Sequence, residues 1–359
     1  MIKTRASLLY SILLFFTILL QLMSIPALGR DKTDVIILKN GDHITGEIKS
    51  LSRGKMSLST DSMGTVQIEW EDVERVTSQW VFEVETETGL RTFGSLAPAA
   101  EPQTIEIIGE GSRNTLNQTS VVRLTQIEAG FLARLEGYVD VGFNFARANR
   151  ATQWTLGGEV KTRGETRQVK TTFSSFFDDR KDVDSTTRNV LTVDFTRFFS
   201  DRWLVTGLTA FTQNQELNLD LRSSFGGDLG RHVIQNNRTL LTIRAGAVFS
   251  REQFAPPDPT PQNPLPMGED RSNIEGSGTI SWELFSFQDP EIDITTTLTV
   301  LPSLSNWGRV RADFDTRIQF ELFKDFSWSA TLFDNYDSRP PEGNETNDFG
   351  ITTSVGWSF

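Results

Sequence analysis

Residues 349–359 read FGITTSVGWSF, and this stretch is the most informative one about the fold. Large apolar residues occupy the odd positions, with Thr353 as the exception, and small or hydroxyl residues occupy the even ones. A spacing of two predicts a β-strand with one apolar and one polar face. The stretch ends on the aromatic Phe359. In a barrel that spans a membrane, the apolar face points outward into lipid and the polar face points inward.

The other end of the chain has the features of a secretory signal, which we assign to residues 1–29. Lys3 and Arg5 supply the positive start, residues 8–25 are an apolar run, and Ala27 begins a small-x-small cleavage site. The alternative is an uncleaved transmembrane anchor, because the run has about the minimum spanning length. No other segment is long and apolar enough for a spanning helix, so the sequence predicts a closed barrel.

Composition excludes several classes of function. The 359 residues include no Cys, which rules out disulfides and thiolate metal sites, and only two His, His43 and His232. Net charge is −12, and it becomes −14 once the two positive charges of the signal are removed. An acidic chain lacks the clustered Lys and Arg that nucleic acid requires, so we expect no nucleic-acid partner. No phosphate loop, dinucleotide fingerprint or cofactor motif is present, and we expect no cofactor, no metal site and no catalytic residues.

A change in aromatic content near residue 130 divides the chain into two domains. Residues 1–130 hold 7 aromatic side chains and residues 131–359 hold 30. We expect a periplasmic module at 33–128 and a membrane barrel at 134–359, since aromatic girdles belong to the barrel.

The module reads as short strands joined by tight turns. Strands are expected at 34–38, 43–48, 56–60, 66–70 and 73–77, and Asn40-Gly41 is a strong hairpin signal. Five short strands in about 45 residues indicate a small bent barrel of Sm or SH3 type. Acidic residues dominate this half, so we expect a periplasmic protein partner or self-association of the module, with a passive spacer as the alternative.

The module pattern occurs twice. Gly41 and Gly46 have counterparts 48 residues later in Gly89 and Gly94, and Val73 has one in Val121. One offset fits both turn and strand positions, which favours two repeats, 33–80 and 81–128, over chance coincidence.

The second domain predicts about twelve antiparallel strands. Residues 309–322 are the clearest case, because uncharged residues alternate there with charged or amide residues at every step. Connections along the domain alternate between short and long, as in membrane barrels. An even strand count puts both barrel ends on the periplasmic side, where the module must be. His232 is expected in a periplasmic turn, 231–234.

Three features together resemble one family. They are the signal, the segment IILKNGDHITGEI at 36–48, and a long-stranded barrel that ends in Trp-Ser-Phe. The chain resembles the bacterial outer-membrane family called domain of unknown function 481, whose members are labelled salt-induced outer membrane proteins. The resemblance implies an outer-membrane barrel of a Gram-negative bacterium, with the Sm-like module as a companion and no catalytic residues to carry over. The strand ending at Phe359 resembles the signal read by the barrel assembly machinery, so we expect that machinery and outer-membrane lipid as partners.

Charged residues of both signs fall on the inward face of the predicted strands. We expect a lumen network made of Asp220, Arg222, Arg244, Asp293, Arg311, Asp313, Asp315, Arg317 and Glu321. A barrel of this size lies between side-chain-filled and channel-forming dimensions, so the network either fills the lumen or forms a narrow selective constriction.

The sequence therefore predicts an all-β, non-enzymatic envelope protein, structural or narrow-pore, with its module in the periplasm. Two alternatives remain open: an envelope-modifying enzyme at the barrel rim and a periplasmic all-β binding protein. The scarcity of His argues against the enzyme.

Overall fold

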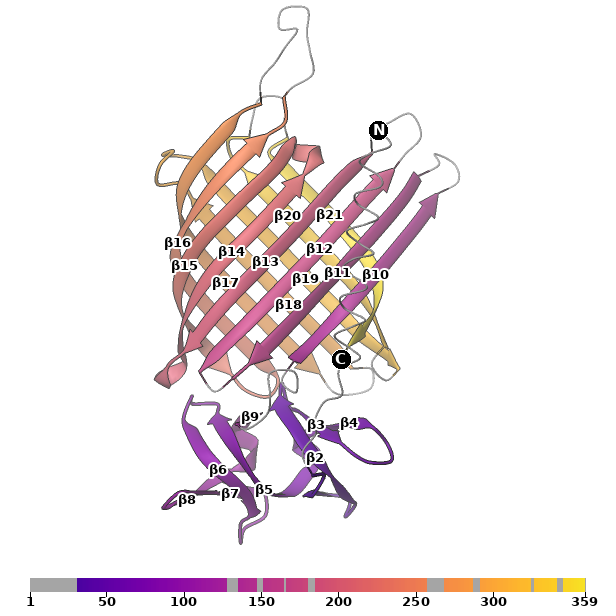
Figure 1. Ribbon diagram of the computed structural model, residues 1–359, viewed down its shortest axis with the longest axis vertical. Helices are drawn as coiled ribbons and strands as arrows, with labels where there is room; N and C mark the ends of the chain where they lie inside the picture. The colour runs from indigo at the N-terminus through magenta and orange to yellow at the C-terminus, as the bar shows by residue number, and fades with distance from the viewer. Residues whose placement is uncertain are drawn as a thin grey trace, which may run out of the picture. The chain divides into compact units, whose positions relative to one another are not determined.

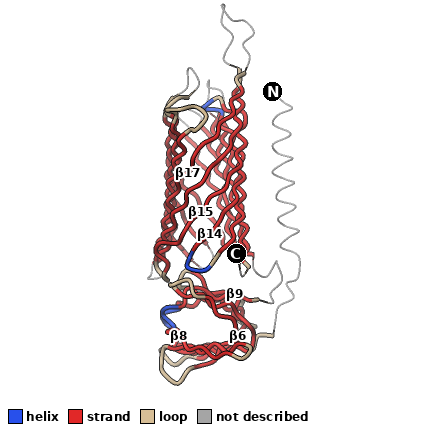
Figure 2. Tube along the Cα trace, turned by 90° about the vertical axis from the view of Figure 1, so that its left-hand side faces the viewer, coloured by secondary structure: helices blue, strands red, loops and turns tan. Residues whose placement is uncertain are grey.

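The computed structural model describes residues 31–127, 135–146, 151–164, 166–179, 185–256, 268–286, 291–323, 326–340 and 345–358. The expected signal at 1–29 lies outside these residues. Residues Lys32–Phe359 form one compact unit. Within the described residues, no helix has the length and apolar character needed to cross a membrane. Figure 2 shows that nearly all of the described chain is strand.

The first domain is a nine-stranded antiparallel sheet that closes on itself. Its strands are β1 (Asp34–Leu38), β2 (His43–Ser52), β3 (Lys55–Ser59), β4 (Thr65–Glu69), β5 (Val73–Thr86), β6 (Arg91–Pro98), β7 (Thr104–Gly109), β8 (Ser112–Asn117) and β9 (Val121–Gln126). Strands β1, β2, β9 and β5 pair in a four-membered ring. Strands β3 and β4 extend the ring beyond β2, and β6, β7 and β8 extend it beyond β5. All five strands expected in the first half are confirmed.

The module holds the apolar core of the molecule. Sixteen buried hydrophobic residues form it, including Ile36, Leu58, Phe82 and Ile107, each at most 1% exposed. A fully buried aliphatic or aromatic side chain contributes about 1.5–3 kcal/mol. This core is therefore sufficient to order a small domain without the disulfides that the chain lacks.

The order of elements in the module recurs at the offset of 48. The short 3-10 helix η1 (Trp70–Asp72) precedes Val73 of β5, and η2 (Gln118–Ser120) precedes Val121 of β9. These equivalent helices bond to each other: Trp70 Nε1 donates to the Gln118 carbonyl at 2.8 Å, and Gln118 Nε2 donates to the Trp70 carbonyl at 3.4 Å. Reciprocal contact between equivalent positions is the arrangement of a two-fold axis. Two repeats and their Sm or SH3 type remain interpretations of this pattern.

The second domain is a closed antiparallel barrel of twelve strands, which confirms the predicted fold class (Figure 1). The strands are β10 (Leu135–Ala146), β11 (Ala151–Arg163), β12 (Arg167–Asp179), β13 (Thr186–Phe198), β14 (Trp203–Asn214), β15 (Leu219–Gln235), β16 (Thr239–Phe254), β17 (Asp270–Ser286), β18 (Ile292–Pro302), β19 (Val310–Phe323), β20 (Phe326–Asp337) and β21 (Asn347–Ser358). The ring is completed where β10 pairs with β21, and the described register there covers four positions, from Tyr138–Ser358 to Val141–Val355.

Barrel burial is inverted relative to a soluble protein. Outward positions are apolar and exposed, as in Phe225 at 49% and Ile280 at 46%. Inward positions are polar and buried, as in Ser250, Glu252 and Glu275, each 0% exposed. Strands with lipid outside and a polar interior produce this pattern. This burial pattern distinguishes a membrane barrel from a soluble β-sandwich, because a soluble sandwich would bury the apolar face of each strand.

Exposed aromatic side chains lie near both ends of the strands on the outer surface. Trp203 begins β14 and Trp357 lies near the end of β21, while Phe143 and Trp154 lie near the opposite end of β10 and β11; all four are more than 40% exposed. Arg197 is exposed on the outer surface of β13, and its guanidinium lies 5.4 Å from the Phe199 ring. Interfacial aromatic belts have this character, and a charge is tolerated there.

The connections between strands differ in length, as the sequence predicts. The connection 236–238 between β15 and β16 is short, and the connection 255–269 between β16 and β17 is long and rich in Pro. One detail is wrong: residues 231–234 are not a turn. Strand β15 continues to Gln235 through an irregularity in its register near His232, so the imidazole lies within the strand.

Closure of the ring is tested by a substitution at Gly356, which pairs with Asp140 across β10 and β21. A Cβ at Gly356 would lie 1.9 Å from Asp140 Oδ1. We expect Gly356→Ala to lower the free energy of unfolding by about 1–3 kcal/mol, the usual cost of overpacking. The measurement is the midpoint of unfolding in urea, monitored by heat-modifiable gel mobility. At Gly278, where a Cβ meets nothing within 4 Å, the same change should leave the midpoint almost unaltered; equal losses at both glycines would contradict the expectation.

Candidate functional site

A buried cluster of arginines and carboxylates lies near the barrel end that carries the long connections. Arg309, just before β19, is 1% exposed, and its Nη1 lies 3.0 Å from Glu252 Oε2. Its Nε donates to Asp337 Oδ1 at 3.0 Å. Arg311 Nε donates to Glu275 Oε1 at 2.7 Å. Arg222 Nε donates to Glu252 Oε1 at 2.8 Å, so Glu252 joins two of the arginines.

Strand register brings these residues together. Arg222 and Glu252 are direct cross-strand partners on β15 and β16, and Arg311 and Asp337 are partners on β19 and β20. Arg222, Arg309 and Arg311 carry three positive charges against the three negative charges of Glu252, Glu275 and Asp337. A buried charge is tolerated only when it is paired and hydrogen-bonded. The balance makes this cluster a neutral, cross-linked layer.

Two further hydrogen bonds cross the barrel interior. Arg188 Nη2 on β13 donates to Asn335 Oδ1 on β20 at 3.2 Å. Asn214 Nδ2 on β14 donates to Asp348 Oδ2 on β21 at 3.1 Å. Each pair of strands is five steps apart around a ring of twelve, close to the six steps that separate opposite walls. Direct side-chain bonds between nearly opposite walls mean that the lumen is narrow at this level.

The middle of the lumen contains separate ion pairs rather than one cluster. Arg317 Nη1 on β19 lies 2.6 Å from Asp140 Oδ2 on β10, and the Arg317 guanidinium stands 4.5 Å from the Tyr138 ring. Arg244 Nη1 lies 3.4 Å from Asp228 Oδ2. Both charge signs therefore continue along the interior.

A third group of charges joins the module to the barrel. Glu85 on β5 is 2% exposed, and its Oε2 accepts from Arg163 Nη2 on β11 at 3.1 Å. Arg123 on β9 approaches the same carboxylate at 3.5 Å, and Arg91 on β6 lies 3.2 Å from Glu83 Oε1. Burial raises the pKa of Glu83 to about 7, because the nearby guanidinium groups only partly oppose the desolvation of its carboxylate.

Glu85 differs from its neighbour in protonation. Burial acts to raise its pKa too, but the guanidinium groups of Arg163, Arg123 and Arg91 outweigh burial and hold the pKa below its usual range. Glu85 is therefore ionised at neutral pH, while Glu83 titrates near neutrality.

Other module residues contact other parts of the barrel rim. Arg53 pairs with Glu283 on β17 and lies 3.8 Å from Asp293 on β18. Lys55 pairs with Glu291, next to β18. Asn237 Nδ2, in the link between β15 and β16, donates to the Val121 carbonyl at 3.0 Å.

The structure brings together only part of the expected lumen network. Arg222 and Arg311 lie in the cluster with Glu252, and Asp313 lines the adjacent recess. Arg244 and Arg317 pair elsewhere in the lumen. Two expected members contact the module instead: Asp293 lies near Arg53, and Glu321 lies 3.9 Å from Lys55. Asp220 and Asp315 are exposed at their positions on β15 and β19.

Sequence reasoning missed the residues that complete the network. Glu252, Glu275, Arg309, Asp337 and Asp140 were not singled out. A signal existed: Glu252 and Glu275 fall on the polar side of β16 and β17 when the alternation is extended to the strand ends. Module residues Glu85 and Arg53 also pair with charges of the barrel, and the periodicity of the barrel strands could not have predicted these contacts.

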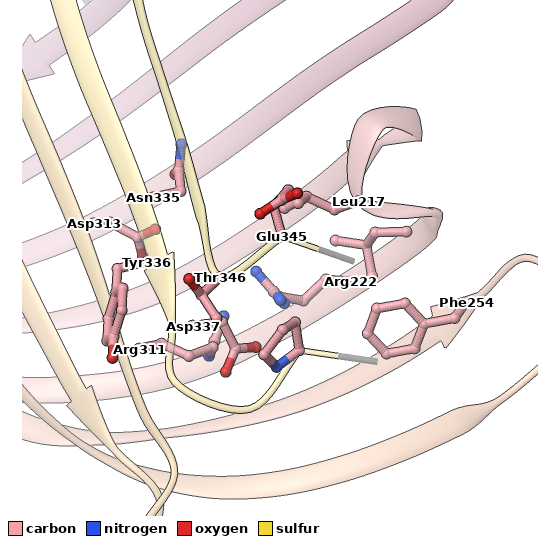
Figure 3. A pocket seen from close by; sticks show the side chains of 12 residues that line it. Leu217, Arg222, Phe254, Arg311, Asp313, Asn335, Tyr336, Asp337, Glu345 and Thr346 are labelled. Atoms are coloured by element: carbon pink, nitrogen blue, oxygen red, sulfur yellow. The ribbon is translucent and has the colours of Figure 1, made fainter. Parts of the chain in front are cut away.

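The recess beside the cluster holds roughly 450 Å³, part of it open solvent. Figure 3 shows Arg222, Arg311 and Asp337 converging on it, with Asp313 and Glu345 nearby. Among the described residues, no group of three or more His, Cys, Asp and Glu side chains could hold a metal ion. His232 Nδ1 lies 2.8 Å from Thr242 Oγ1.

The cluster predicts a large effect of removing Glu252. Glu252→Gln leaves Arg222 and Arg309 buried with too little negative charge, and the loss of one partner of a buried ion pair costs about 3–5 kcal/mol. The free energy of unfolding, measured by urea titration with tryptophan fluorescence, should fall by that amount.

The matched control is Asp270→Asn. Asp270 pairs with Arg251 at 3.1 Å, but both side chains are more than half exposed, so its removal should cost less than about 1 kcal/mol. A loss at Glu252 no larger than the loss at Asp270 would show that the cluster does not stabilise the barrel.

Comparison with known proteins adds a family assignment. No curated protein matches the chain. Among solved structures, the NanC porin shares 8% identity at a TM-score of 0.37, with 62% of this chain and 98% of that chain covered. The β domain of the Bordetella autotransporter BrkA shares 10% identity at a TM-score of 0.34, with 63% and 97% covered. The KdgM porin, solved in complex with disordered oligogalacturonate, shares 10% identity at a TM-score of 0.32, with 63% and 99% covered. Residues 139–359, more than half of the chain, match the model of one family, so the chain belongs to the family described as protein of unknown function, DUF481.

Proposed function

We propose that the protein is an outer-membrane β-barrel with a narrow lumen that passes small ions and excludes larger solutes. The observation that carries this proposal is the pair of cross-lumen bonds, Arg188 to Asn335 and Asn214 to Asp348. These bonds place polar side chains across the interior, at a level where a wide channel would be filled with water.

Two features support this function over a sealed barrel. Most buried side chains of the barrel strands are hydroxyl, amide or charged, so water can enter wherever side chains leave space. The recess lined by Arg222, Arg311 and Asp313 extends this polar interior next to the cluster. Rings of charged side chains are one means by which pores select small ions.

The enzyme alternative has little support from the described residues. A hydrolytic or transfer site needs a nucleophile or an activated water beside a base. His232 is the one imidazole of the barrel domain, and it lies close to a threonine hydroxyl near the end of β15 that faces the module. The described residues also offer no metal-binding group to replace it.

Conductance in a planar lipid bilayer tests the proposal. The wild-type chain should give small, discrete, salt-dependent steps. Arg188→Ala combined with Asn214→Ala removes both cross-lumen donors, so each step should become about twofold or more larger, since conduction is set by the narrowest part of the lumen.

Arg197→Ala is the control, because Arg197 is exposed on the outer surface and contributes nothing to the lumen. Its step size should equal the wild-type value. A folded barrel that stays silent, both as wild type and as the double variant, would mean a filled lumen and a purely structural role.

A further inference from the structure

The last five residues of strand β5 of the module are buried on both faces of the strand. Residues 82–86 are all at most 5% exposed. Phe82 and Val84 face the apolar core of the module. Glu83 and Glu85 belong to the opposite face, because side chains alternate along a strand. Two carboxylates this deeply buried need a second covering surface.

The barrel supplies that surface. Arg163, at the end of β11, donates to Glu85, and Gln235, at the end of β15, donates to the same carboxylate at 3.2 Å. The Phe198 ring of β13 lies beneath the Arg163 guanidinium at 3.6 Å and within 5.9 Å of the Arg91 guanidinium. The charged face of the module therefore rests on the ends of three barrel strands.

These contacts reach across the mouth of the barrel. Arg163 is on β11, and Glu283, which pairs with Arg53, is on β17. The two strands are six steps apart in the ring of twelve, which is the separation of opposite walls. The links at Asn237 and Glu291 provide contacts between them. A compact body bonded to opposite walls and to points between them lies over the opening.

We propose that the periplasmic module is a displaceable plug that closes this end of the lumen and opens it by undocking. The inference rests on the proposed pore and adds its regulation. The docking contacts described above are ion pairs, hydrogen bonds and cation–π contacts, and polar interfaces between domains permit relative motion.

The repeat pattern of the module offers a matched pair of test positions. Gly41 and Gly89 are 48 residues apart in equivalent turns, with φ of +90° and +83°. A Cβ at Gly41 meets nothing within 4 Å, whereas a Cβ at Gly89 would lie 2.9 Å from the Arg202 backbone nitrogen of the barrel. Both alanine substitutions strain the backbone in the same way, and only Gly89→Ala presses on the barrel.

The first experiment compares these two variants of the full-length chain in a planar bilayer. Gly89→Ala should raise the fraction of time spent open about tenfold relative to Gly41→Ala, because the clash disfavours only the docked state. Step size should stay the same in both, since the lumen is unaltered. Equal open fractions in the two variants would overturn the plug.

A reversible cross-link provides the second experiment. Asn237 Nδ2 donates to the Thr119 carbonyl at 3.3 Å, and the chain has no Cys of its own. Thr119→Cys with Asn237→Cys should form a disulfide under oxidising conditions, seen as a shift in gel mobility. The oxidised protein should be silent, and reduction with dithiothreitol should restore the steps.

The pH dependence gives a third readout. Glu83 faces Glu85, Arg91 and Arg123 of the module and Arg163 of the barrel. Its pKa is raised to about 7 in the docked state and would return toward the usual 4.5 once undocking exposes the carboxylate to water. The docked state therefore holds an extra proton between these values, so the open fraction should rise as pH increases from 5 to 8, and Glu83→Gln should flatten this rise.

The outcomes separate the plug from the pore. A disulfide that forms while oxidised and reduced proteins conduct equally would refute the plug and leave the pore intact. A further outcome is that the disulfide forms on oxidation, but neither the reduced double-Cys protein nor Gly89→Ala conducts. This outcome would refute the pore and with it any gate.

Discussion

The structure depends on the absence of hydrogen-bond partners in hydrocarbon. A sheet placed in lipid must leave no edge, because each unpaired backbone group there costs several kcal/mol. The chain meets this constraint by pairing its first and last barrel strands, β10 and β21. Once the ring is closed, apolar side chains have to face outward, and the polar residues of every strand are confined to a small interior.

That confinement explains the chemistry of the lumen. Charges packed at close range and shielded from bulk water are stable only in near-neutral groups. The three arginines and three carboxylates around Glu252 satisfy this condition, and so does the Arg317–Asp140 pair. At the module end, the same requirement is met by residues from both domains, because Arg163 and Glu283 find their partners in Glu85 and Arg53. The module is thus part of the charge balance of the barrel rim.

The parts of the fold that depend on neighbouring residues in the sequence could be predicted from the sequence. Alternation in 349–359 and 309–322 reports the two faces of a strand directly, and about twelve strands followed from such alternation together with the turn residues. The preceding small barrel followed from its short strands and tight turns. The lumen network was predicted less well because pairing depends on register, which periodicity does not define. Arg222 was identified but its partner Glu252 was not, since the two are 30 residues apart and meet only after β15 and β16 align. Glu321 and Asp293 were assigned to the lumen because nothing local distinguishes the rim from the interior.

The short seam between β10 and β21 also bears on how the barrel is made. Its partners, such as Val141 and Val355, are more than 200 residues apart along the chain, whereas all other neighbouring strands of the barrel are consecutive in the sequence. Bringing such distant segments together has a large entropic cost. The hydrogen bonds of the four described pairs offset little of this cost until the rest of the sheet has formed. We therefore expect ring closure to be the last step of assembly. Until that step the nascent sheet is an open ribbon, and its lifetime depends on how long its two free edges can be kept from pairing with other chains.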